Sequence, residues 1–348
     1  MSDKKDILSL DFDELKEYVK NELEEKAFRA DQIARWMSLG KSFEEMTDLP
    51  EKLRIKLTER AVLHYPKVRA KYVSQIDGTV KFLFEFSDGE CVEGVVMDYE
   101  HGKSMCISTQ AGCRMGCKFC ASTIGGKKRD LRASEILGEI IVATRECGER
   151  ISGIVLMGIG EPFDNYDNVI KFLKLVNSPK SLGIGYRHIS LSTCGIVPGI
   201  YKLADEDMPI TLSISLHAHN NETRNEIMPI NKRYDINELL KACVDWFDKT
   251  GRRISFEYTL ICGKNDSSAD AEALASLLKG YFGKRPFHVN LIPVNPVTES
   301  GFSRGSSSSV KKFAARLNEL SVNATVRRTL GADISASCGQ LRLNSASD

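Results

Sequence analysis

The chain has 348 residues, of which 42% are hydrophobic and 27% are charged, as in a typical globular protein. Its 48 basic and 47 acidic side chains leave a net charge of +1, so composition alone gives no support to nucleic-acid binding. No apolar run approaches the ~20 residues that span a bilayer, and the first residues lack a signal peptide's apolar core. We therefore expect a cytoplasmic protein with no membrane partner, whose ten cysteines stay reduced.

The N-terminal part of the chain has the apolar periodicity of helices between residues 8 and 62. Four of its apolar residues fall on one helical face: Phe12, Leu15, Tyr18 and Val19. A capping-box pattern begins at Ser42, and Pro50 stands where the first turn of another helix would begin. We interpret residues 1–65 as a small helical accessory domain.

Residues 66–98 change to the alternating pattern of β-strands. Asp-Gly pairs at 77–78 and 88–89 mark two tight turns between three apolar stretches. A three-stranded meander is expected here, and we interpret it as a linker.

From residue 104 onward, strand and helix patterns alternate, which predicts parallel strands with right-handed crossovers. The expected strands are 104–108, 153–157, 188–193, 210–216, 254–260, 287–292 and 324–328. The clearest helices are 133–147, 168–177, 236–249, 269–281 and 308–320. With about six repeats and no dinucleotide fingerprint, residues 99–348 are predicted to form an α/β fold, an incomplete (βα)6 barrel. Such barrels bind ligands at the carboxyl ends of their strands.

Three cysteines, Cys113, Cys117 and Cys120, are spaced C-x3-C-x2-C. Thiolates are the ligands of iron–sulfur clusters, and three of them leave one iron of a four-iron cluster open. A structural zinc site would need a fourth ligand at a set spacing, and the next cysteine, Cys147, lies on an expected helix. The pattern favours a 4Fe–4S cluster over zinc.

Polar residues follow several expected strands at the ends where a barrel binds ligands. They are Glu161 with the adjacent Gly160, Ser192, Ser215 with His217, and Asn295. Each alone is more often a capped strand end than a ligand contact, but together they predict one pocket. A carboxylate at Glu161 can accept from an ammonium group. For His217, a ligand contact is favoured over proton transfer.

Two further cysteines stand out from the rest. Cys338 lies in a loop of small residues near the C-terminus, where a tail carrying a thiol back to the barrel mouth would suit a covalent nucleophile. Cys106 ends the first expected barrel strand. Cys194, Cys243 and Cys262 are read as small buried hydrophobes.

The cluster spacing, with Phe119 before its last cysteine, resembles the radical S-adenosylmethionine (SAM) superfamily. Over essentially its whole length the chain resembles the RlmN/Cfr family of radical SAM RNA methyltransferases. The matching stretches are STQAGC (108–113), GIGEP (158–162), LST (191–193), SLH (215–217), MPIN (228–231), residues 290–296 and CGQL (338–341).

The resemblance implies cofactors and residue roles. Cys113, Cys117 and Cys120 would hold a 4Fe–4S cluster. SAM would be bound by Gly160, Glu161, Ser192, Ser215, Leu216, His217 and Asn295. A first SAM would methylate Cys338, and a second would give a radical that takes hydrogen from this methyl group so that its carbon adds to adenine. Glu93 would accept the adenine proton, and Cys106 would release the product by forming a transient disulfide with Cys338.

The family implies RNA as substrate and two target atoms. RlmN types methylate carbon 2 of an adenosine in 23S rRNA and of an adenosine beside the tRNA anticodon, whereas Cfr types methylate carbon 8 of the rRNA adenosine and give antibiotic resistance. Residues 114–116 and 295–299 favour carbon 2. The helical domain and basic residues at the barrel mouth would contact RNA phosphates: Lys127, Lys128, Arg129 and Arg304. A flavodoxin or ferredoxin is the expected electron donor, and a monomer is expected.

Two departures and two rival readings accompany this resemblance. Ser335 and Ser337 replace an Asp and an Ala of the family tail, and Ser335 is expected to weaken the positioning of the tail loop. A radical SAM activase would not need Cys106 and Cys338. An RNA-binding protein with a structural zinc or cluster would not cleave SAM.

Overall fold

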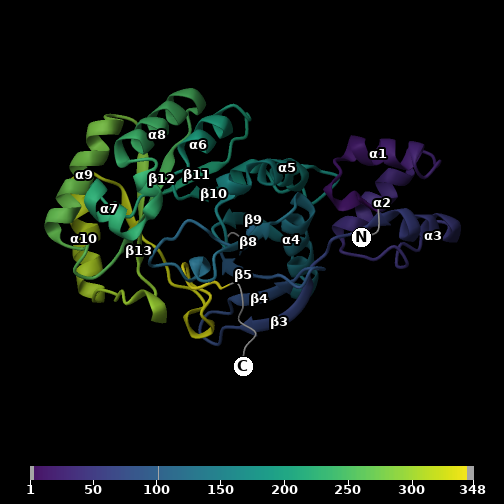
Figure 1. Cartoon of the computed structure of the whole chain (residues 1–348), viewed down its shortest axis with the longest axis horizontal. Helices are drawn as coiled ribbons and strands as arrows, with labels where there is room; N and C mark the ends of the chain where they lie inside the picture. Colours follow the sequence, from purple (N-terminus) through teal and green to yellow (C-terminus); the bar gives the residue numbers. More distant parts are fainter. Residues whose placement is uncertain (1–3, 101, 343–348) are drawn as a thin grey trace.

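The computed structural model describes residues 4–100 and 102–342. Its centre is a ten-stranded sheet in the order β14-β13-β12-β11-β10-β9-β6-β5-β4-β3 (Figure 1). The strands are β3 (Lys67–Val73), β4 (Val80–Glu85), β5 (Cys91–Tyr99), β6 (Gly102–Cys106), β9 (Ile151–Leu156), β10 (Ile189–Thr193), β11 (Thr211–Ser215), β12 (Ile254–Leu260), β13 (Phe287–Pro293) and β14 (Ala324–Val326).

The strands from β6 to β14 in this sheet pair in parallel, and helices connect most of them. The helices of this part are α4 (Ala133–Cys147), α5 (Tyr166–Asn177), α6 (Val197–Ala204), α7 (Asn221–Ile227), α8 (Ile236–Thr250), α9 (Ser268–Phe282) and α10 (Ser307–Glu319). Helices α5, α6, α8, α9 and α10 lie along the outside of the curved sheet (Figure 1). This arrangement confirms the predicted α/β partial barrel. Helices α6 and α7 were not among the predicted elements.

The predicted meander is present, and its strands β3, β4 and β5 extend the barrel sheet instead of standing apart from it. Strand β5 pairs antiparallel with β6, and Val95 lies directly opposite Cys106. On the other side of β5, Val95 lies opposite Lys81 of β4. Because directly opposite residues point to the same face of a sheet, these three side chains form one row across three strands.

Three helices form the N-terminal part: α1 (Phe12–Asn21), α2 (Arg29–Ser38) and α3 (Glu51–Arg60). Two short strands, β1 (Lys5–Asp6) and β2 (Ala61–Val62), pair in parallel and close this unit. The predicted capping-box pattern at Ser42 forms a turn in which the Ser42 backbone donates to Glu45, but no helix follows it. Across the described ranges, no helix has both the length and the apolarity that crossing a lipid bilayer demands.

A short antiparallel pair, β7 (Gln110–Gly112) and β8 (Lys127–Asp130), lies outside the main sheet and flanks the cysteine motif. It closes the loop of residues 113–126 at its base. The loop therefore begins and ends beside the carboxyl ends of the barrel strands.

Candidate active site

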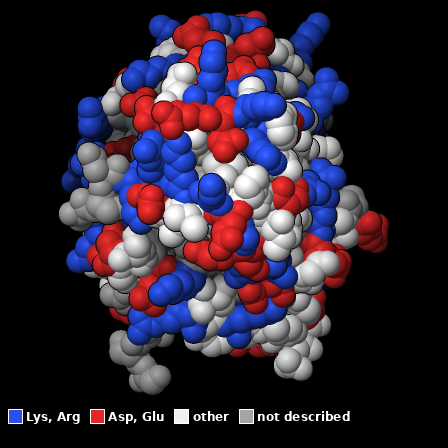
Figure 2. All heavy atoms as spheres, turned by 90° about the vertical axis from the view of Figure 1, so that its right-hand side faces the viewer, with Lys and Arg blue, Asp and Glu red and all other residues white. Residues whose placement is uncertain are grey.

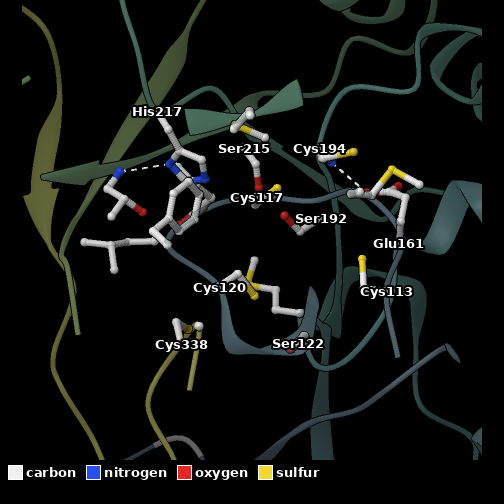
Figure 3. A pocket seen from close by; sticks show the side chains of 18 of the residues that line it. Cys113, Cys117, Cys120, Ser122, Glu161, Ser192, Cys194, Ser215, His217 and Cys338 are labelled. Atoms are coloured by element: carbon white, nitrogen blue, oxygen red, sulfur yellow. Dashed lines mark hydrogen bonds between the residues drawn. The ribbon is translucent and has the colours of Figure 1, made fainter. Parts of the chain in front are cut away.

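A cavity lies at the carboxyl ends of the barrel strands, closed on one side by the cysteine loop and by the C-terminal tail (Figure 3). Ten residues predicted for the site line it: Cys113, Cys117, Cys120, Gly160, Glu161, Ser192, Ser215, His217, Asn295 and Cys338. The strand ends, the cysteine motif and the tail are therefore brought together as one site.

The three motif cysteines face this cavity from one loop (Figure 3). Burial raises the pKa of the Cys113 thiol to about 12, and it also raises the pKa of Cys117 and of Cys120. Thiols in such surroundings stay protonated unless a positive charge is added, and an iron cluster supplies that charge.

The donor set suits a cluster better than a single ion. Between residues 4 and 100 and between 102 and 342, no group of three or more His, Cys, Asp or Glu is arranged to hold a metal ion. In a four-iron cluster each thiolate binds a separate iron, so three thiols spread around a cavity are the appropriate ligands. Cys113, Cys117 and Cys120 thus fit a 4Fe–4S cluster with one open iron.

The glycine turn after β9 packs against the segment that leads to the cysteine motif. Gly160 has a φ of +108°, and a Cβ there would stand 2.7 Å from the Cβ of Gln110. A Cβ at Gly158 would stand 2.5 Å from the carbonyl oxygen of Ile107. These contacts show that the two glycines let the turn approach the protein's own chain, and both also line the cavity.

Glu161 is buried, and its carboxylate orients the neighbouring strand end. The backbone N–H of Cys194 donates to one oxygen over 2.7 Å, and that of Phe163 donates to the other over 3.1 Å. Burial raises the pKa of Glu161, and these two hydrogen bonds oppose the rise. A carboxylate accepts about four hydrogen bonds, so Glu161 keeps the capacity to accept from a ligand ammonium.

His217 follows β11 in the left-handed region, with a φ of 55°. Its Nδ1 accepts the backbone N–H of Thr259 over 2.9 Å, which assigns the ring proton to Nε2. The Phe119 ring of the cysteine loop meets it edge-on, with centroids 4.9 Å apart. Burial, with a smaller effect of Arg224, lowers the pKa of His217 to about 3. The ring is therefore neutral at physiological pH and suited to a ligand contact.

Leu216 differs from the prediction. Its side chain is fully buried in the core, and within the described chain it is absent from the cavity lining. Its carbonyl accepts from Arg224, a fully buried residue of α7 whose guanidinium also donates to the carbonyls of Cys194 and Ser215. Arg224 joins the ends of β10 and β11, a role that the sequence reading missed because it treated arginines as surface residues.

The tail is held over the cavity by hydrogen bonds from the rim of the barrel and from the cysteine loop. The Asn295 Nδ2 donates to the carbonyl of Cys338 over 3.0 Å. On the cysteine loop, the Ala121 backbone donates to the Gly339 carbonyl and the Ser122 hydroxyl donates to the Leu341 carbonyl, each over 2.8 Å. Figure 3 shows the tail bringing Cys338 close to Cys120.

A second cavity lies next to the first and contains Cys106. Five residues line both cavities: Met157, Ile292, Asn295, Arg327 and Cys338. Cys106 and Cys338 are free thiols, as are the other cysteines. Cys194 and Cys243 are buried as predicted, but the prediction of a buried Cys262 is wrong, because this residue is exposed. Burial and, to a smaller extent, the neighbouring Cys338 raise the pKa of Cys106 to about 12, whereas Arg327 opposes this rise.

Arg327 lines both cavities and lies within electrostatic reach of Cys338 and Cys106. Its guanidinium lies 3.7 Å from the Glu257 carboxylate and 3.4 Å from the Met157 sulfur. The nearby Cys338 is the largest cause of the raised pKa of Arg327. Of the residues that line both cavities, Arg327 is the one that carries a positive charge. It therefore places this charge near both thiols.

Glu93 lies on β5, outside the lining that the described residues form around either cavity. Its side chain is 1% exposed, its Oε1 is 3.1 Å from the Lys81 ammonium, and its Oε2 accepts the backbone N–H of Arg342 over 2.8 Å. The carboxylate therefore lies beneath the tail, on the same face of the sheet as Cys106.

The tail loop is held firmly despite the two serine departures. Asp333 accepts from the Ser74 hydroxyl over 2.7 Å, and Asp77 accepts from the Gly331 backbone over 2.9 Å. The Ser337 hydroxyl donates to the Leu330 carbonyl over 2.8 Å, a bond that alanine could not make. These contacts tie the tail loop to the turn between β3 and β4, and the weakening expected from Ser335 stays a prediction.

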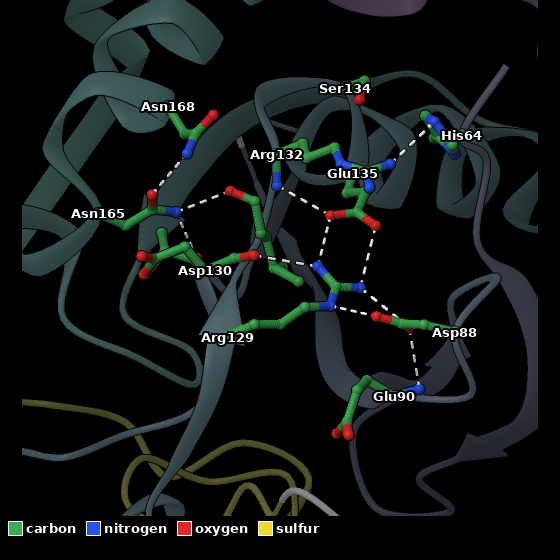
Figure 4. A network of polar contacts seen from close by, with 12 residues as sticks. His64, Asp88, Glu90, Arg129, Asp130, Arg132, Ser134, Glu135, Asn165 and Asn168 are labelled. Carbon is green, nitrogen blue, oxygen red and sulfur yellow. Dashed lines mark hydrogen bonds and ion pairs between the residues drawn. The ribbon is translucent and has the colours of Figure 1, made fainter. Parts of the chain in front are cut away.

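Two of the four basic residues expected to contact RNA are occupied within the protein. Arg129 pairs with Asp88 and Glu135 (Figure 4), and Lys127 pairs with Asp164 and Asp130. Lys128 and Arg304 are exposed. The face that carries the N-terminal helices mixes acidic and basic side chains (Figure 2). Of these four residues, Lys128 and Arg304 therefore remain the expected phosphate contacts.

Comparison with known proteins identifies the family. Residues 107–275 match the radical SAM superfamily, and residues 5–63 match the ribosomal RNA large subunit methyltransferase N-terminal domain. A curated relative from Clostridium botulinum, named probable dual-specificity RNA methyltransferase RlmN, is 52% identical over 97% of this chain and 96% of its own length. A relative of the same name from Clostridium novyi is 50% identical over 98% of both chains.

A solved structure agrees with these matches. The radical SAM methyltransferase from Sphaerobacter thermophilus is 40% identical and superposes with a TM-score of 0.92, covering 98% of this chain and all of that one. Membership of the superfamily brings a 4Fe–4S cluster and SAM as cofactors. The chain belongs to the RlmN family of radical SAM RNA methyltransferases.

Proposed function

We propose that this enzyme methylates carbon 2 of an adenosine in 23S rRNA and of an adenosine beside the tRNA anticodon. The names of the clostridial relatives, which describe dual-specificity RNA methyltransferases, support two RNA substrates. The observation that carries the mechanism is the position of Cys338, which lines both the cavity of the cluster cysteines and the cavity of Cys106.

In the first half of the reaction, the Cys338 sulfur takes a methyl group from one SAM and leaves S-adenosylhomocysteine. This displacement needs the thiolate, and the Arg327 guanidinium lines the same cavities as Cys338. Asn295 fixes the backbone at Cys338. Glu161, with Ser192, Ser215 and His217, would bind SAM in the larger cavity. Leu216 would act there only through its backbone.

Cys113, Cys117 and Cys120 would hold the cluster, which when bound supplies the electron that lets a second SAM abstract hydrogen. The Cys338 methyl group loses one hydrogen atom, and its carbon bonds to carbon 2 of adenine. Adenine carbon 2 is electron-poor, so radical addition succeeds where attack by a nucleophilic ring carbon is not available.

Release of the product then uses Glu93 and Cys106. Glu93 accepts the proton from carbon 2 while the adduct gives back the one electron that started the reaction. The Cys106 thiolate then attacks the Cys338 sulfur. A sulfur–sulfur bond forms as the sulfur–carbon bond of Cys338 breaks. The electron pair of the broken bond stays on carbon, which takes up a proton to become the methyl group.

The electrons of this scheme balance. Joining two thiols as a disulfide releases two electrons, and converting the second SAM to methionine and 5′-deoxyadenosine consumes two. No external oxidant is therefore needed, but the disulfide between Cys106 and Cys338 must be reduced by an external thiol before the next turnover. A flavodoxin or ferredoxin would start the reaction with one electron.

Peptide mass spectrometry tests the proposal. The reconstituted enzyme is incubated anaerobically with SAM, a reductant and a fragment of 23S rRNA or tRNA. A methyl group on the Cys338 peptide together with 2-methyladenosine in the RNA is the expected result. An unmodified Cys338 peptide beside SAM cleavage would overturn the mechanism, and 8-methyladenosine would move the target to carbon 8.

The N-terminal helices are the proposed accessory surface for RNA, with residues 1–65 as their domain. The match of residues 5–63 to a ribosomal RNA methyltransferase N-terminal domain supports this assignment. We also propose that the enzyme acts as a monomer in the cytoplasm, where ribosomal and transfer RNA are found. Sedimentation of the reconstituted enzyme tests the oligomeric state.

A further inference from the structure

Lys81 is a buried lysine near the start of β4, and the reaction described above does not use it. Its side chain is 9% exposed, and its ammonium lies 3.1 Å from the Glu93 carboxylate. The same ammonium donates to the carbonyl of Ser335 in the tail loop over 3.5 Å and lies 5.3 Å from the centre of the Tyr72 ring. One cation therefore contacts both the proposed proton acceptor and the tail that carries Cys338.

Stability does not explain this pair. Removing a lysine and a glutamate from water is unfavourable, and apolar residues of similar size commonly serve a buried position as well or better. A pair between a 9% exposed and a 1% exposed side chain therefore points to a function of the charges.

The position of Lys81 in the sheet links it to the resolving thiol. Lys81, Val95 and Cys106 form one row across β4, β5 and β6. Strands lie about 4.8 Å apart, so the Lys81 and Cys106 backbones are separated by about 10 Å. Glu93, two residues before Val95, lies on the same face of β5. Glu93, Lys81 and Cys106 therefore lie on one face of the sheet, under the tail.

The contact with Ser335 makes the position of Lys81 depend on the tail. Ser335 adopts a left-handed backbone conformation with a φ of 50°, which regular strands and helices do not contain. In this turn its carbonyl accepts from the Lys81 ammonium. Asp333, two residues earlier, ties the same loop to the turn before β4. When the tail occupies this place, the ammonium has an acceptor on each side.

We propose that Lys81 is a positioning residue for proton removal, whose ammonium holds the Glu93 carboxylate in place while the tail is closed over it. This role rests on the proposed function of Glu93. In this proposal a residue of β4 takes part in the reaction. The tail then helps to hold Lys81 in addition to carrying Cys338.

The charged surroundings of Glu93 favour this assignment. Among the described residues, its charged neighbours with printed contacts are Lys81 from β4 and Arg342 from the tail, and the Arg342 guanidinium is itself paired with Glu299. Cys106 of β6 faces the same side of the sheet, and Glu139 of α4 lies 3.4 Å from a Cβ built at Gly94, the next residue of β5. Removing the Lys81 side chain would therefore leave Glu93 with the backbone N–H of Arg342 as its remaining contact from a charged neighbour within the described chain.

The test compares Lys81→Met, which removes the charge, with Lys81→Arg, which keeps it. Each full-length holoenzyme is given SAM, reductant and an RNA fragment that the wild-type enzyme methylates, and the covalent protein–RNA adduct is followed on denaturing gels. We expect Cys338 methylation to be unchanged in Lys81→Met, and decay of the adduct to slow about tenfold to a hundredfold. The acid side of the pH–rate profile should move to higher pH, and Lys81→Arg should restore most of the rate.

Two controls separate this role from a structural one. Lys103→Met removes a lysine of β6 that pairs with Asp98 and Glu149, and it should change neither adduct decay nor the pH profile. In an enzyme that already carries Glu93→Gln, adding Lys81→Met should have no further effect, because Lys81 acts through Glu93.

The outcomes are distinguishable. Unchanged adduct decay and an unchanged pH profile in Lys81→Met would overturn the proposal, as would loss of Cys338 methylation in that variant, which would mark a purely structural role. If Lys81→Met fails to fold, the pH profile of Lys81→Gln decides. Absence of Cys338 methylation in the wild-type enzyme would instead refute the proposed function itself.

Discussion

The side-chain amide of Asn295 donates a hydrogen bond to the backbone carbonyl of Cys338 over 3.0 Å. Asn295 follows β13 at the rim of the barrel, whereas Cys338 belongs to the tail, so this bond joins the rigid part of the molecule to the segment that carries the reactive sulfur. It places Cys338 at the boundary between the two cavities.

Asn295→Asp should prevent methylation of Cys338. The substitution keeps the size of the side chain but replaces the donor with an acceptor that repels the Cys338 carbonyl. We expect about tenfold to a hundredfold less methyl on the Cys338 peptide, as for the loss of a buried hydrogen bond with its donor. Asn177→Asp is the matched control, because Asn177 donates to the Ile184 carbonyl far from the site. Equal methylation of both variants would contradict this role.

Cys106→Ala should trap the RNA on the protein. Without the Cys106 thiolate, the bond between the Cys338 sulfur and the product carbon is not broken. A denaturing gel should show a covalent adduct, and peptide mapping should place it at Cys338. Cys338→Ala should give no adduct, and Cys243→Ala, which alters a fully buried cysteine of α8, should turn over normally. Free methylated RNA from Cys106→Ala would exclude Cys106 as the resolving thiol.

Lys128 and Arg304 should carry more of the RNA affinity than Arg129. Each exposed cation that binds a phosphate steepens the salt dependence of binding, so Lys128→Ala and Arg304→Ala should each lower the slope of log K against log salt by about one. Arg129→Ala should leave the slope nearly unchanged and lower the melting temperature, because Arg129 is paired with Glu135, whose side chain is 2% exposed. Filter binding at several salt concentrations measures the slopes.

His217 should make the protein less stable in acid. Its pKa is about 3 in the folded protein and close to 6.5 when unfolded, so below pH 6.5 the unfolded state takes up a proton that the folded state does not. Between pH 7.5 and 5.5 this difference costs about 1.4 kcal/mol of stability. His217→Asn keeps an acceptor near the Thr259 amide and tolerates the left-handed backbone, and it should remove this part of the pH dependence.

Thermal unfolding of wild-type and His217→Asn protein at the two pH values measures the effect. The difference in unfolding free energy between the pH values should be smaller in the variant. An identical pH dependence would mean that His217 takes up a proton in the folded state.

The sequence could predict those parts of the fold that depend on local pattern. Helix α4 spans 133–147, as its apolar periodicity indicated, and β12 spans 254–260. Short elements were harder: α7 is a seven-residue helix that carries little periodic signal, although its N-cap Asn220 is in place. The extension of the barrel sheet by β3, β4 and β5 depends on strand pairing, which no local pattern reveals.

The residues of the candidate site also fall into those that the sequence could predict and those that it could not. Cys113, Cys117 and Cys120 could be found because their spacing is itself the signal, and their position beside the strand ends followed from the barrel. Arg224 and Lys81 could not be found, because a charged residue in a sequence is read as exposed unless its partner is known. Their partners, the carbonyls of other strands and a carboxylate on β5, are defined only after folding.

The continuous sheet that joins β5 to β6 has a consequence for how this enzyme can vary. Because Val95 is opposite Cys106, the spacing between Glu93, the proposed proton acceptor, and Cys106, the proposed resolving thiol, is fixed by backbone pairing and not by side-chain contacts. Deleting one residue from β5 would turn Glu93 to the opposite face. Residues in the turns of the meander can change in number without moving that pair. Substrate range can therefore diversify in the loops and the N-terminal helices while the relative placement of acid–base and sulfur chemistry is inherited unchanged.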